Sequence, residues 1–166
     1  MPPPLILDPS SLDLGRVVAD REAIRRVNPQ RHEMEQLTAI ILVDGEQHLV
    51  AGYKDVGADE FWVPGHLPSY PLLPGVLVCE AAAQLCSYCM VQGGLLRGDF
   101  VGFGGLENVR FRSMVRAGDR LVLVGKAVKI HRRQTLFAVQ GFVGGTMAFH
   151  ADILGVPLSR RAGEET

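Results

Sequence analysis

Strand-like and helix-like hydrophobic patterns alternate along this chain. The run "LTAIILVDG" (37–45) is rich in β-branched residues and ends in Asp44-Gly45, a dipeptide typical of tight hairpin turns. The run "QHLVAGYKDV" (47–56) would be the returning strand. We therefore expect two antiparallel strands here. Four further runs have strand character and are separated by turn signals: 100–115, 119–132, 134–145 and 146–158.

One long segment between these strands has the pattern of a helix. It spans about residues 76–95 and follows Pro74-Gly75 directly, and proline is common where helices begin. Nearly all its positions are small or apolar, with Glu80 as its one acid. A helix that is apolar on all sides is expected to be buried. A shorter helix is expected within "DREAIRRVNP", ending before Pro29.

The order of these elements predicts the fold class. A short helix is followed by two strands, one long apolar helix and four more strands. A single helix is buried on all sides only where a curved sheet wraps around it, so we expect an α+β fold with an antiparallel sheet around one central helix. We divide the chain into an N-terminal extension with a short helix (1–36), the main domain (37–158) and a tail (159–166).

Composition supports one compact domain. The chain has 166 residues, of which 47% are hydrophobic and 21% charged, enough apolar material for a packed core. The formal net charge of −1 provides no basic excess that would favour nucleic acid or an anionic membrane as a partner.

The cysteines and the termini bear on the compartment. Cys79, Cys86 and Cys89 lie in the predicted helix, and an odd, clustered set does not fit a secreted disulfide framework. We expect small buried side chains without a redox or metal role. The N-terminus lacks the pattern of a signal peptide, and the longest apolar stretch contains Glu80 and two glutamines, which membrane helices rarely carry. These features predict a cytoplasmic protein outside the membrane.

Other common functional motifs are missing from the sequence. His32, His48, His131 and His150 have no metal-ligand spacing, and "GFGGLEN" (102–108) lacks the glycine pattern of a nucleotide loop. No serine lies in a G-x-S-x-G context, so serine hydrolysis has no support.

Residues 65–85, "GHLPSYPLLPGVLVCEAAAQL", contain a long and irregular motif. It resembles the active-site motif of the 3-hydroxyacyl-[acyl-carrier-protein] dehydratases of type II fatty acid synthesis. The matching residues are Gly65-His66-Leu67-Pro68, Pro71, Pro74-Gly75-Val76-Leu77 and Glu80-Ala81-Ala82-Ala83-Gln84. The similarity extends to "GLENVRFRSMVRAGDRL" (105–121) and covers about residues 37–157. It implies the hot-dog fold, in agreement with the order of elements.

The resemblance implies a lyase of fatty acid or related lipid or polyketide synthesis. Eliminating water from a 3-hydroxyacyl thioester needs a base, an acid and a group that stabilises charge on the thioester oxygen. His66 suits the base because imidazole titrates near neutral pH. Glu80 suits the acid because a buried carboxyl group holds its proton more readily than an exposed one. In the family these two residues come from different subunits, which implies a homodimer or a dimer-based higher oligomer.

The start of the predicted helix suits the stabilising role. Helix N-termini present unpaired N–H groups and partial positive charge, so we expect Gly75 and Val76 to bind the thioester oxygen. The missing side chain of Gly75 would let a substrate carbonyl approach. This elimination requires no metal or redox cofactor. The resemblance implies that the substrate is carried on the phosphopantetheine arm of an acyl carrier protein.

Two departures from the family motif concern the acyl site. Leu67 stands where the family usually has phenylalanine, and Tyr70 stands where a small residue is common, so we expect both in the wall of the acyl site. A local excess of arginines is a candidate surface for docking an acidic carrier protein. Its members are Arg110, Arg112, Arg116, Arg132 and Arg133.

Two alternatives stay open on the sequence. Hot-dog thioesterases share the fold and the thioester substrate, although they usually lack the spacing between His66 and Glu80. A non-catalytic acyl-binding subunit would also keep the fold, and the changes at Leu67 and Tyr70 leave room for it. Product analysis with a 3-hydroxyacyl thioester separates all three.

Overall fold

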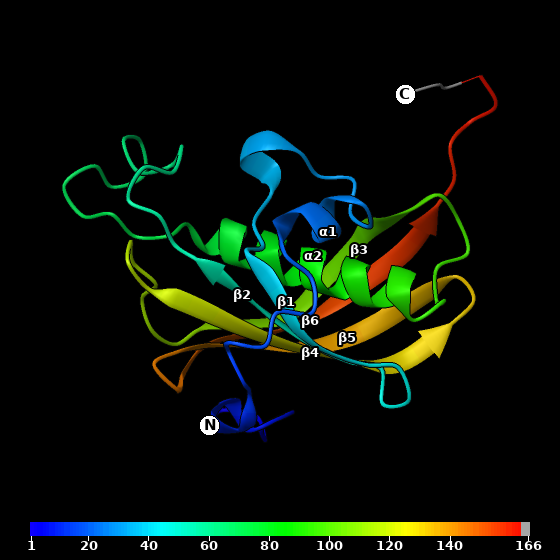
Figure 1. The fold of residues 1–166 in the computed structure, drawn as a ribbon, viewed down its shortest axis with the longest axis horizontal. Coiled ribbons are helices and arrows are strands. Elements are labelled where there is room, and N and C mark those ends of the chain that lie inside the picture. Colours follow the sequence, from blue (N-terminus) through cyan, green and yellow to red (C-terminus); the bar gives the residue numbers. More distant parts are fainter. Residues whose placement is uncertain (164–166) are drawn as a thin grey trace.

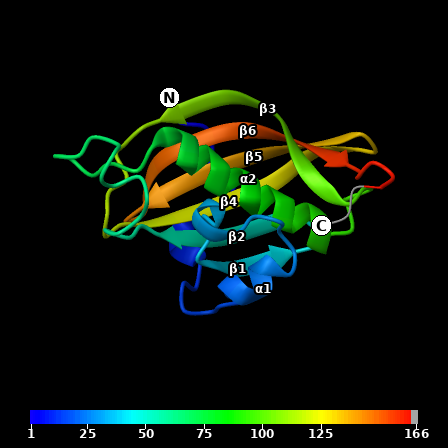
Figure 2. The ribbon, with the colours of Figure 1, turned by 90° about the horizontal axis from the view of Figure 1, so that it is seen from above.

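A computed structural model describes residues 1–163 as one antiparallel sheet wrapped around a long helix, as Figures 1 and 2 show. The six strands of this region lie in the order β1-β2-β4-β5-β6-β3. The main elements are β1 (Ala39–Asp44), β2 (Leu49–Asp55), α2 (Gly75–Gln92), β3 (Phe100–Phe111), β4 (Arg120–His131), β5 (Gln134–Val143) and β6 (Thr146–Leu158).

The predicted α+β class and the predicted order of elements are confirmed. Each strand lies within its expected range, and the hairpin between β1 and β2 forms at Asp44, whose carboxylate accepts hydrogen bonds from two N–H groups of the turn. The long helix begins at Gly75 and ends at Gln92 because Gly93 and Gly94 follow, two residues with poor helix propensity.

The core lies between α2 and the concave face of the sheet. Ala81, Ala82 and Leu85 of α2 are fully buried, and small side chains let the helix approach the strands closely. The three cysteines are also buried and unpaired, as predicted, and burial raises the pKa of Cys89 to about 11. Such thiols behave as small apolar groups.

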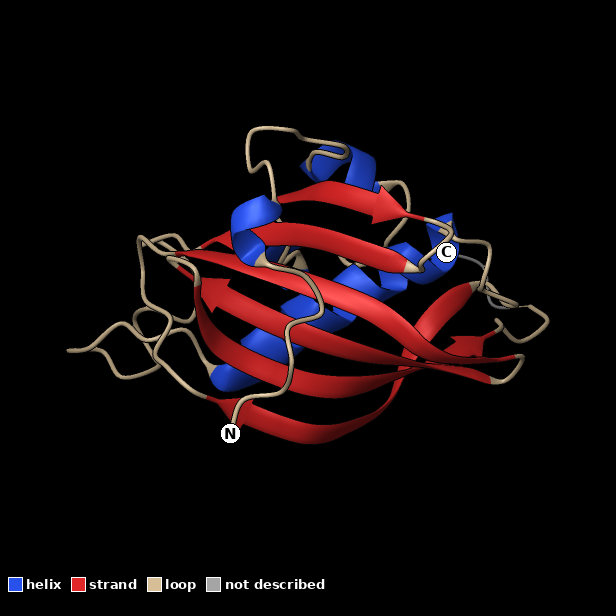
Figure 3. Cartoon of the chain, turned by 90° about the horizontal axis from the view of Figure 1, so that it is seen from below, coloured by secondary structure: helices blue, strands red, loops and turns tan. Residues whose placement is uncertain are grey.

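The N-terminal extension belongs to the folded unit. It contains η1 (Pro9–Ser11), α1 (Arg21–Arg25) and η2 (His32–Met34). Its first residues cross the outer face of the sheet, where Ile6, Leu7 and Leu12 pack on a second apolar cluster (Figure 3). The buried amide of Gln140 secures this segment, since its Oε1 accepts from Ile6 N and its Nε2 donates to Pro4 O. In the tail, residues 159–163 form no helix or strand, and residues 164–166 lie outside the described residues.

By length and composition, α2 is apolar enough to cross a membrane, and it is the one such helix in residues 1–163. However, 67% of its 18-residue window is buried inside the fold. Its apolarity is therefore explained by its place in the core.

Candidate active site

His66 lies in an exposed loop that projects from one end of the sheet between β2 and α2 (Figures 1 and 2). The side chain of His66 is half-buried. The backbone N–H of His66 donates to the carbonyl of Trp62 at 2.7 Å. The next residue, Leu67, has φ +53°, a left-handed conformation that is uncommon for a branched side chain. Strain of this kind concentrates at functional sites.

The end of this loop is fixed against the connection between β3 and β4. Leu73 N donates to Val115 O at 2.8 Å. The hydroxyl of Tyr70 accepts a hydrogen bond from the guanidinium of Arg116, which also stacks on the ring at 4.9 Å, and the hydroxyl contacts the sulfur of Met114. The path from His66 to the helix is therefore held by polar and aromatic contacts at Tyr70 and by the buried residue Leu73.

The first turn of α2 presents two free N–H groups. Pro74 is the N-cap residue, and its carbonyl accepts from Leu77 N at 2.9 Å and Val78 N at 3.2 Å. Among the hydrogen bonds of residues 1–163, neither Gly75 N nor Val76 N has an acceptor. These groups carry the positive end of the helix dipole, so they can bind a developing negative charge.

The reason for glycine at position 75 differs from the sequence-based expectation. A Cβ at Gly75 would lie 2.8 Å from Cζ of Phe111 and 3.1 Å from the neighbouring ring carbons. Such contacts are too short for real side chains. The absence of a side chain at Gly75 therefore makes room for the ring of Phe111, and this side of Gly75 is not open to a substrate carbonyl.

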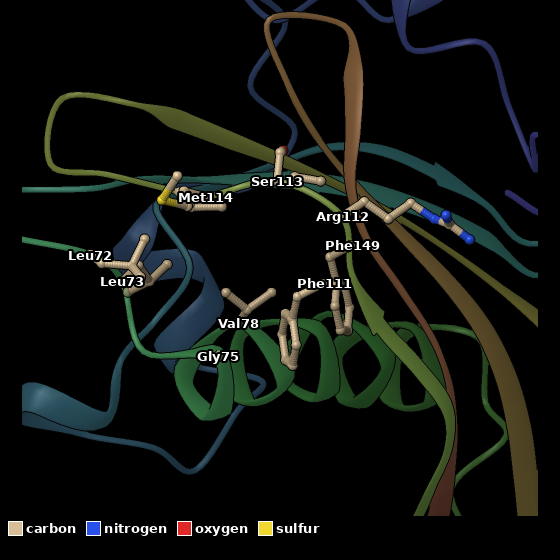
Figure 4. Close-up of a pocket in the computed structure, with 11 residues that line it drawn as sticks. Leu72, Leu73, Gly75, Val78, Phe111, Arg112, Ser113, Met114 and Phe149 are labelled. Atoms are coloured by element: carbon tan, nitrogen blue, oxygen red, sulfur yellow. The ribbon is translucent and has the colours of Figure 1, made fainter.

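A cavity of about 700 Å³ opens at this end of α2 (Figure 4). Most of its lining is apolar, and the rings of Phe111 and Phe149 stack over the helix with their centroids 5.5 Å apart. The lining residues are Leu72, Leu73, Gly75, Val78, Phe111, Arg112, Ser113, Met114, Val115, Ala148 and Phe149. The predicted site residues Leu67, Tyr70 and Val76 do not line it, and the side chain of Val76 is 76% exposed.

Glu80 lies one to two turns further along α2 and is half-buried. Its Oε1 accepts a hydrogen bond from Nε2 of Gln84 at 2.8 Å. Gln84 is only 2% exposed, and the backbone fixes its orientation: Nε2 also donates to Met34 O at 2.6 Å, and Oε1 accepts from Gln36 N at 2.9 Å. The role of Gln84 was not predicted from the sequence, although its spacing of four residues from Glu80 places both on one helix face.

A second cavity, of about 90 Å³, lies beside Glu80. It lies between α2 and the neighbouring strands β3 and β6, and its lining is mainly apolar or small. The lining residues are Gln30, Glu80, Ala83, Cys86, Ser87, Val101, Gly102, Phe103, Ile153, Leu154 and Gly155. Glu80 is the one acid among them.

His66 and Glu80 do not come together within one chain. His66 lines neither of these two cavities, and no hydrogen bond among the described residues joins it to Glu80. Within the described residues, the two groups therefore share neither of these cavities and no hydrogen bond.

The five arginines predicted to form one docking surface are separated. Arg110 and Arg112 lie at the end of β3 near the first turn of α2, and Arg116 follows in the next connection. Arg132 and Arg133 lie in the turn between β4 and β5, at the other end of β4. Because β4 has 12 residues and a strand rises about 3.3 Å per residue, the two groups are separated by roughly 35 Å measured along this strand. The prediction of a single five-arginine surface is wrong.

One contact near the larger cavity joins a charged group, Arg112, to His150. The side chain of Arg112 points away from the cavity (Figure 4), and its Nε lies 3.2 Å from Nδ1 of His150. Burial, together with the nearby guanidinium groups of Arg112 and Arg110, lowers the pKa of His150.

Within residues 1–163, no group of three or more His, Cys, Asp or Glu side chains could hold a metal ion.

Comparison with known proteins agrees with the observed fold. Residues 28–152 match the FabA-like domain. The chain belongs to the FabA-like family. The dehydratase resemblance stated from the sequence is thereby confirmed, and so is the hot-dog fold.

Individual members of the family support this assignment. The 3-hydroxyacyl-[acyl-carrier-protein] dehydratase FabZ of Acinetobacter baylyi is 36% identical over 138 residues, which cover 81% of this chain and 92% of that protein. The enzyme of the same name from Bacillus velezensis is 38% identical over 104 residues, covering 63% and 73%. Among solved structures, the dehydratase heterocomplex ApeI:P from Xenorhabdus doucetiae has a TM-score of 0.64 at 18% identity, covering 81% of this chain and 90% of that one, a likeness that supports the fold.

Proposed function

We propose that this chain is a hydro-lyase that eliminates water from 3-hydroxyacyl thioesters to give trans-2-enoyl thioesters. The proposed substrate is carried on the phosphopantetheine arm of an acyl carrier protein, the carrier in the name of the FabZ relatives. Membership of a dehydratase family supports the class of reaction. The proposed setting is fatty acid synthesis or a related lipid or polyketide route.

One observation carries the proposal: a carboxylate held in a fixed orientation on a mainly apolar wall. Glu80 is kept in place by Gln84, itself fixed by two backbone groups. A half-buried acid on a core helix is costly unless it is paired, and here its partner is a neutral amide rather than a cation. That arrangement suits a group that must give up and regain a proton.

The reaction assigns one task to each group. His66 removes the proton from the carbon next to the thioester carbonyl, and Glu80 gives a proton to the departing 3-hydroxyl. A C–H bond and a C–O bond break, a C=C bond forms, and water leaves. The N–H groups of Gly75 and Val76 stabilise the negative charge on the thioester oxygen, and each such donor typically contributes about 3 kcal/mol to lowering the barrier.

The separation of His66 and Glu80 supports a site shared between two subunits. In this proposal, the exposed edge of β3 faces a second copy of the chain. β3 pairs with β6 on one side only, and a 12-residue edge strand with unpaired backbone groups favours pairing with another strand. Exposed apolar side chains on and near this edge would be covered in the dimer: Leu67, Val76, Phe103, Leu106 and Phe111.

Leu67, Tyr70 and three arginines have proposed roles at the entrance. Leu67 and Tyr70 lie on the loop of His66 and would form the wall where the acyl chain enters. Arg110, Arg112 and Arg116 lie at the same end of the sheet and would attract an acidic carrier protein. Arg132 and Arg133 at the opposite end have no part in this docking proposal.

The experiment is to incubate the purified protein with a 3-hydroxyacyl thioester on acyl carrier protein and, in parallel, on coenzyme A. Dehydration produces the conjugated enoyl thioester, followed by its ultraviolet absorbance and mass. Release of free thiol instead would show a thioesterase. Binding with neither product would show a non-catalytic acyl-binding subunit, and either result would overturn the proposal.

A further inference from the structure

Most residues next to His66 in its loop are exposed, yet the loop begins at a polar and buried anchor. Glu60 accepts three hydrogen bonds: Oε2 accepts from Lys54 Nζ at 2.8 Å and from Trp62 Nε1 at 2.9 Å, and Oε1 accepts from Gly57 N at 2.8 Å. Lys54 lies on β2, so this carboxylate ties the start of the loop to the sheet.

Stability of the fold alone does not explain why this anchor is made of charged residues. The side chain of Lys54 is 6% exposed and that of Glu60 is 18% exposed. Removing such a pair from water costs about as much as the pair returns, and apolar residues of similar size often stabilise a fold equally well. A buried lysine and glutamate at this place therefore point to a positional role.

The anchor leads directly to His66. Trp62 is 4% exposed, and its indole N–H is held by Glu60. The carbonyl of Trp62 accepts hydrogen bonds from Gly65 N at 3.2 Å and His66 N at 2.7 Å. The backbone of His66 is thus placed by Trp62, and Trp62 is placed by Glu60.

We propose that Lys54 and Glu60 are positioning residues that hold Trp62, and through its carbonyl His66, in place before substrate binds. Lys54 fixes the carboxylate from the rigid strand β2, and the carboxylate fixes the indole. Preorganisation of this kind has a large effect on rate, because a displacement of about 1 Å in a reacting group can cost about 10²-fold. The inference rests on the proposed role of His66 as the base.

Trp62 offers a direct test, because it is the one tryptophan in the chain. The first variant is Glu60→Asp, which keeps the charge beside Lys54 but withdraws the carboxylate by one methylene. We expect a red-shifted Trp62 emission and greater quenching by acrylamide, with an unchanged far-UV circular dichroism spectrum. We also expect kcat to fall about 10- to 100-fold while KM changes little.

The matched control is Asp59→Asn. Asp59 is the neighbouring carboxylate and is exposed, so its loss should leave emission, kcat and KM as in the wild type. Trp62→Phe, which removes the indole donor, should lower kcat as Glu60→Asp does. Because both changes break the same chain of contacts, the double variant should lose no more than the larger single loss.

Several results would overturn the inference. These are wild-type emission and kcat in Glu60→Asp, losses that multiply in the double variant, or a fall in activity that only tracks the fraction of unfolded protein. If wild type and variants all fail to dehydrate the substrate while the emission shifts as expected, the anchor is supported and the proposed function is rejected. An unchanged emission with active wild type rejects the anchor alone.

Discussion

The side-chain amide of Gln84 donates a hydrogen bond to the carboxylate of Glu80, 2.8 Å away and one helical turn earlier on α2. The amide has no freedom to turn over, because Met34 O needs its N–H and Gln36 N needs its oxygen. The N-terminal extension thereby orients the proposed acid through the side chain of Gln84.

We predict that Gln84→Leu lowers dehydration activity about 10-fold or more and lowers the free energy of unfolding by about 1–3 kcal/mol. Activity falls because Glu80 loses its orienting donor, and stability falls because Gln36 N and Met34 O lose a buried partner. The measurements are kcat and denaturant unfolding. Gln92→Leu is the control, since Gln92 is exposed at the end of the same helix. Equal kcat in both variants would contradict the orienting role.

We predict that His66→Ala and Glu80→Gln each reduce dehydration about 10²–10⁴-fold without unfolding the protein. When the two inactive proteins are mixed and exchange subunits at equal amounts, half of the dimers are mixed, and one of their two sites combines an intact His66 with an intact Glu80. Activity should then recover to about one quarter of the wild-type value. No recovery after subunit exchange has been verified by mass spectrometry would reject shared sites.

We predict that Gly75→Ala disturbs the first turn of α2 through Phe111. The new Cβ would meet the ring at 2.8 Å, so the ring must move, and overpacking of this kind costs about 1–3 kcal/mol. Both thermal stability and kcat should fall. Phe111→Leu in the same chain should restore much of the stability lost. If the double variant is as unstable as the sum of the singles, the Phe111 contact is not the cause.

Features set by neighbouring residues could be predicted from the sequence, whereas contacts between residues far apart in the sequence could not. Strand and helix boundaries were predicted within a few residues because turn signals and hydrophobic spacing are local. The contact between Phe111 and Gly75 joins residues 36 positions apart in the sequence, and Gln140 binds the N-terminal residue Ile6, so no local pattern reports either contact. Arginines counted along the sequence were grouped wrongly because the two ends of one strand face opposite ends of the molecule.

We predict that Glu60 makes stability depend on pH in the acid range. Burial alone would raise the pKa of Glu60, but hydrogen bonds from Lys54, Trp62 and Gly57 outweigh it, and the net pKa is lowered from 4.5. A lowered folded-state pKa means that the stabilisation is complete above about pH 4.5 and is lost as the pH falls through the lower folded-state value. One such group contributes at most about 1.4 kcal/mol per pH unit.

The measurement is the free energy of unfolding between pH 6 and pH 3 for wild type and for Lys54→Met/Glu60→Gln, which removes both buried charges together. The double variant should show a shallower loss of stability in acid. Other charged side chains line the same polar hollow and are unchanged in both proteins: Arg21, His32, Glu33, Glu35, Asp55 and Asp59. Parallel curves for the two proteins would show that Glu60 does not titrate differently in the folded state.

Our last prediction concerns Tyr70 and the choice of acyl chain. The ring of Tyr70 is half-exposed, and its hydroxyl contacts Arg116 and the sulfur of Met114, which lines the 700 Å³ cavity. Tyr70→Gly removes this bulk beside the cavity without touching the proposed reacting groups. We expect longer 3-hydroxyacyl thioesters to gain in kcat/KM relative to the shortest, since each methylene in a pocket is worth about 1–3 kcal/mol of discrimination. Tyr70→Phe is the control, because it keeps the ring and removes only the hydroxyl with its contacts to Arg116 and Met114, so its chain-length profile should match the wild type. A common fall across all chain lengths in Tyr70→Gly would instead place Tyr70 in support of the His66 loop, and an unchanged profile would show that the ring points to solvent.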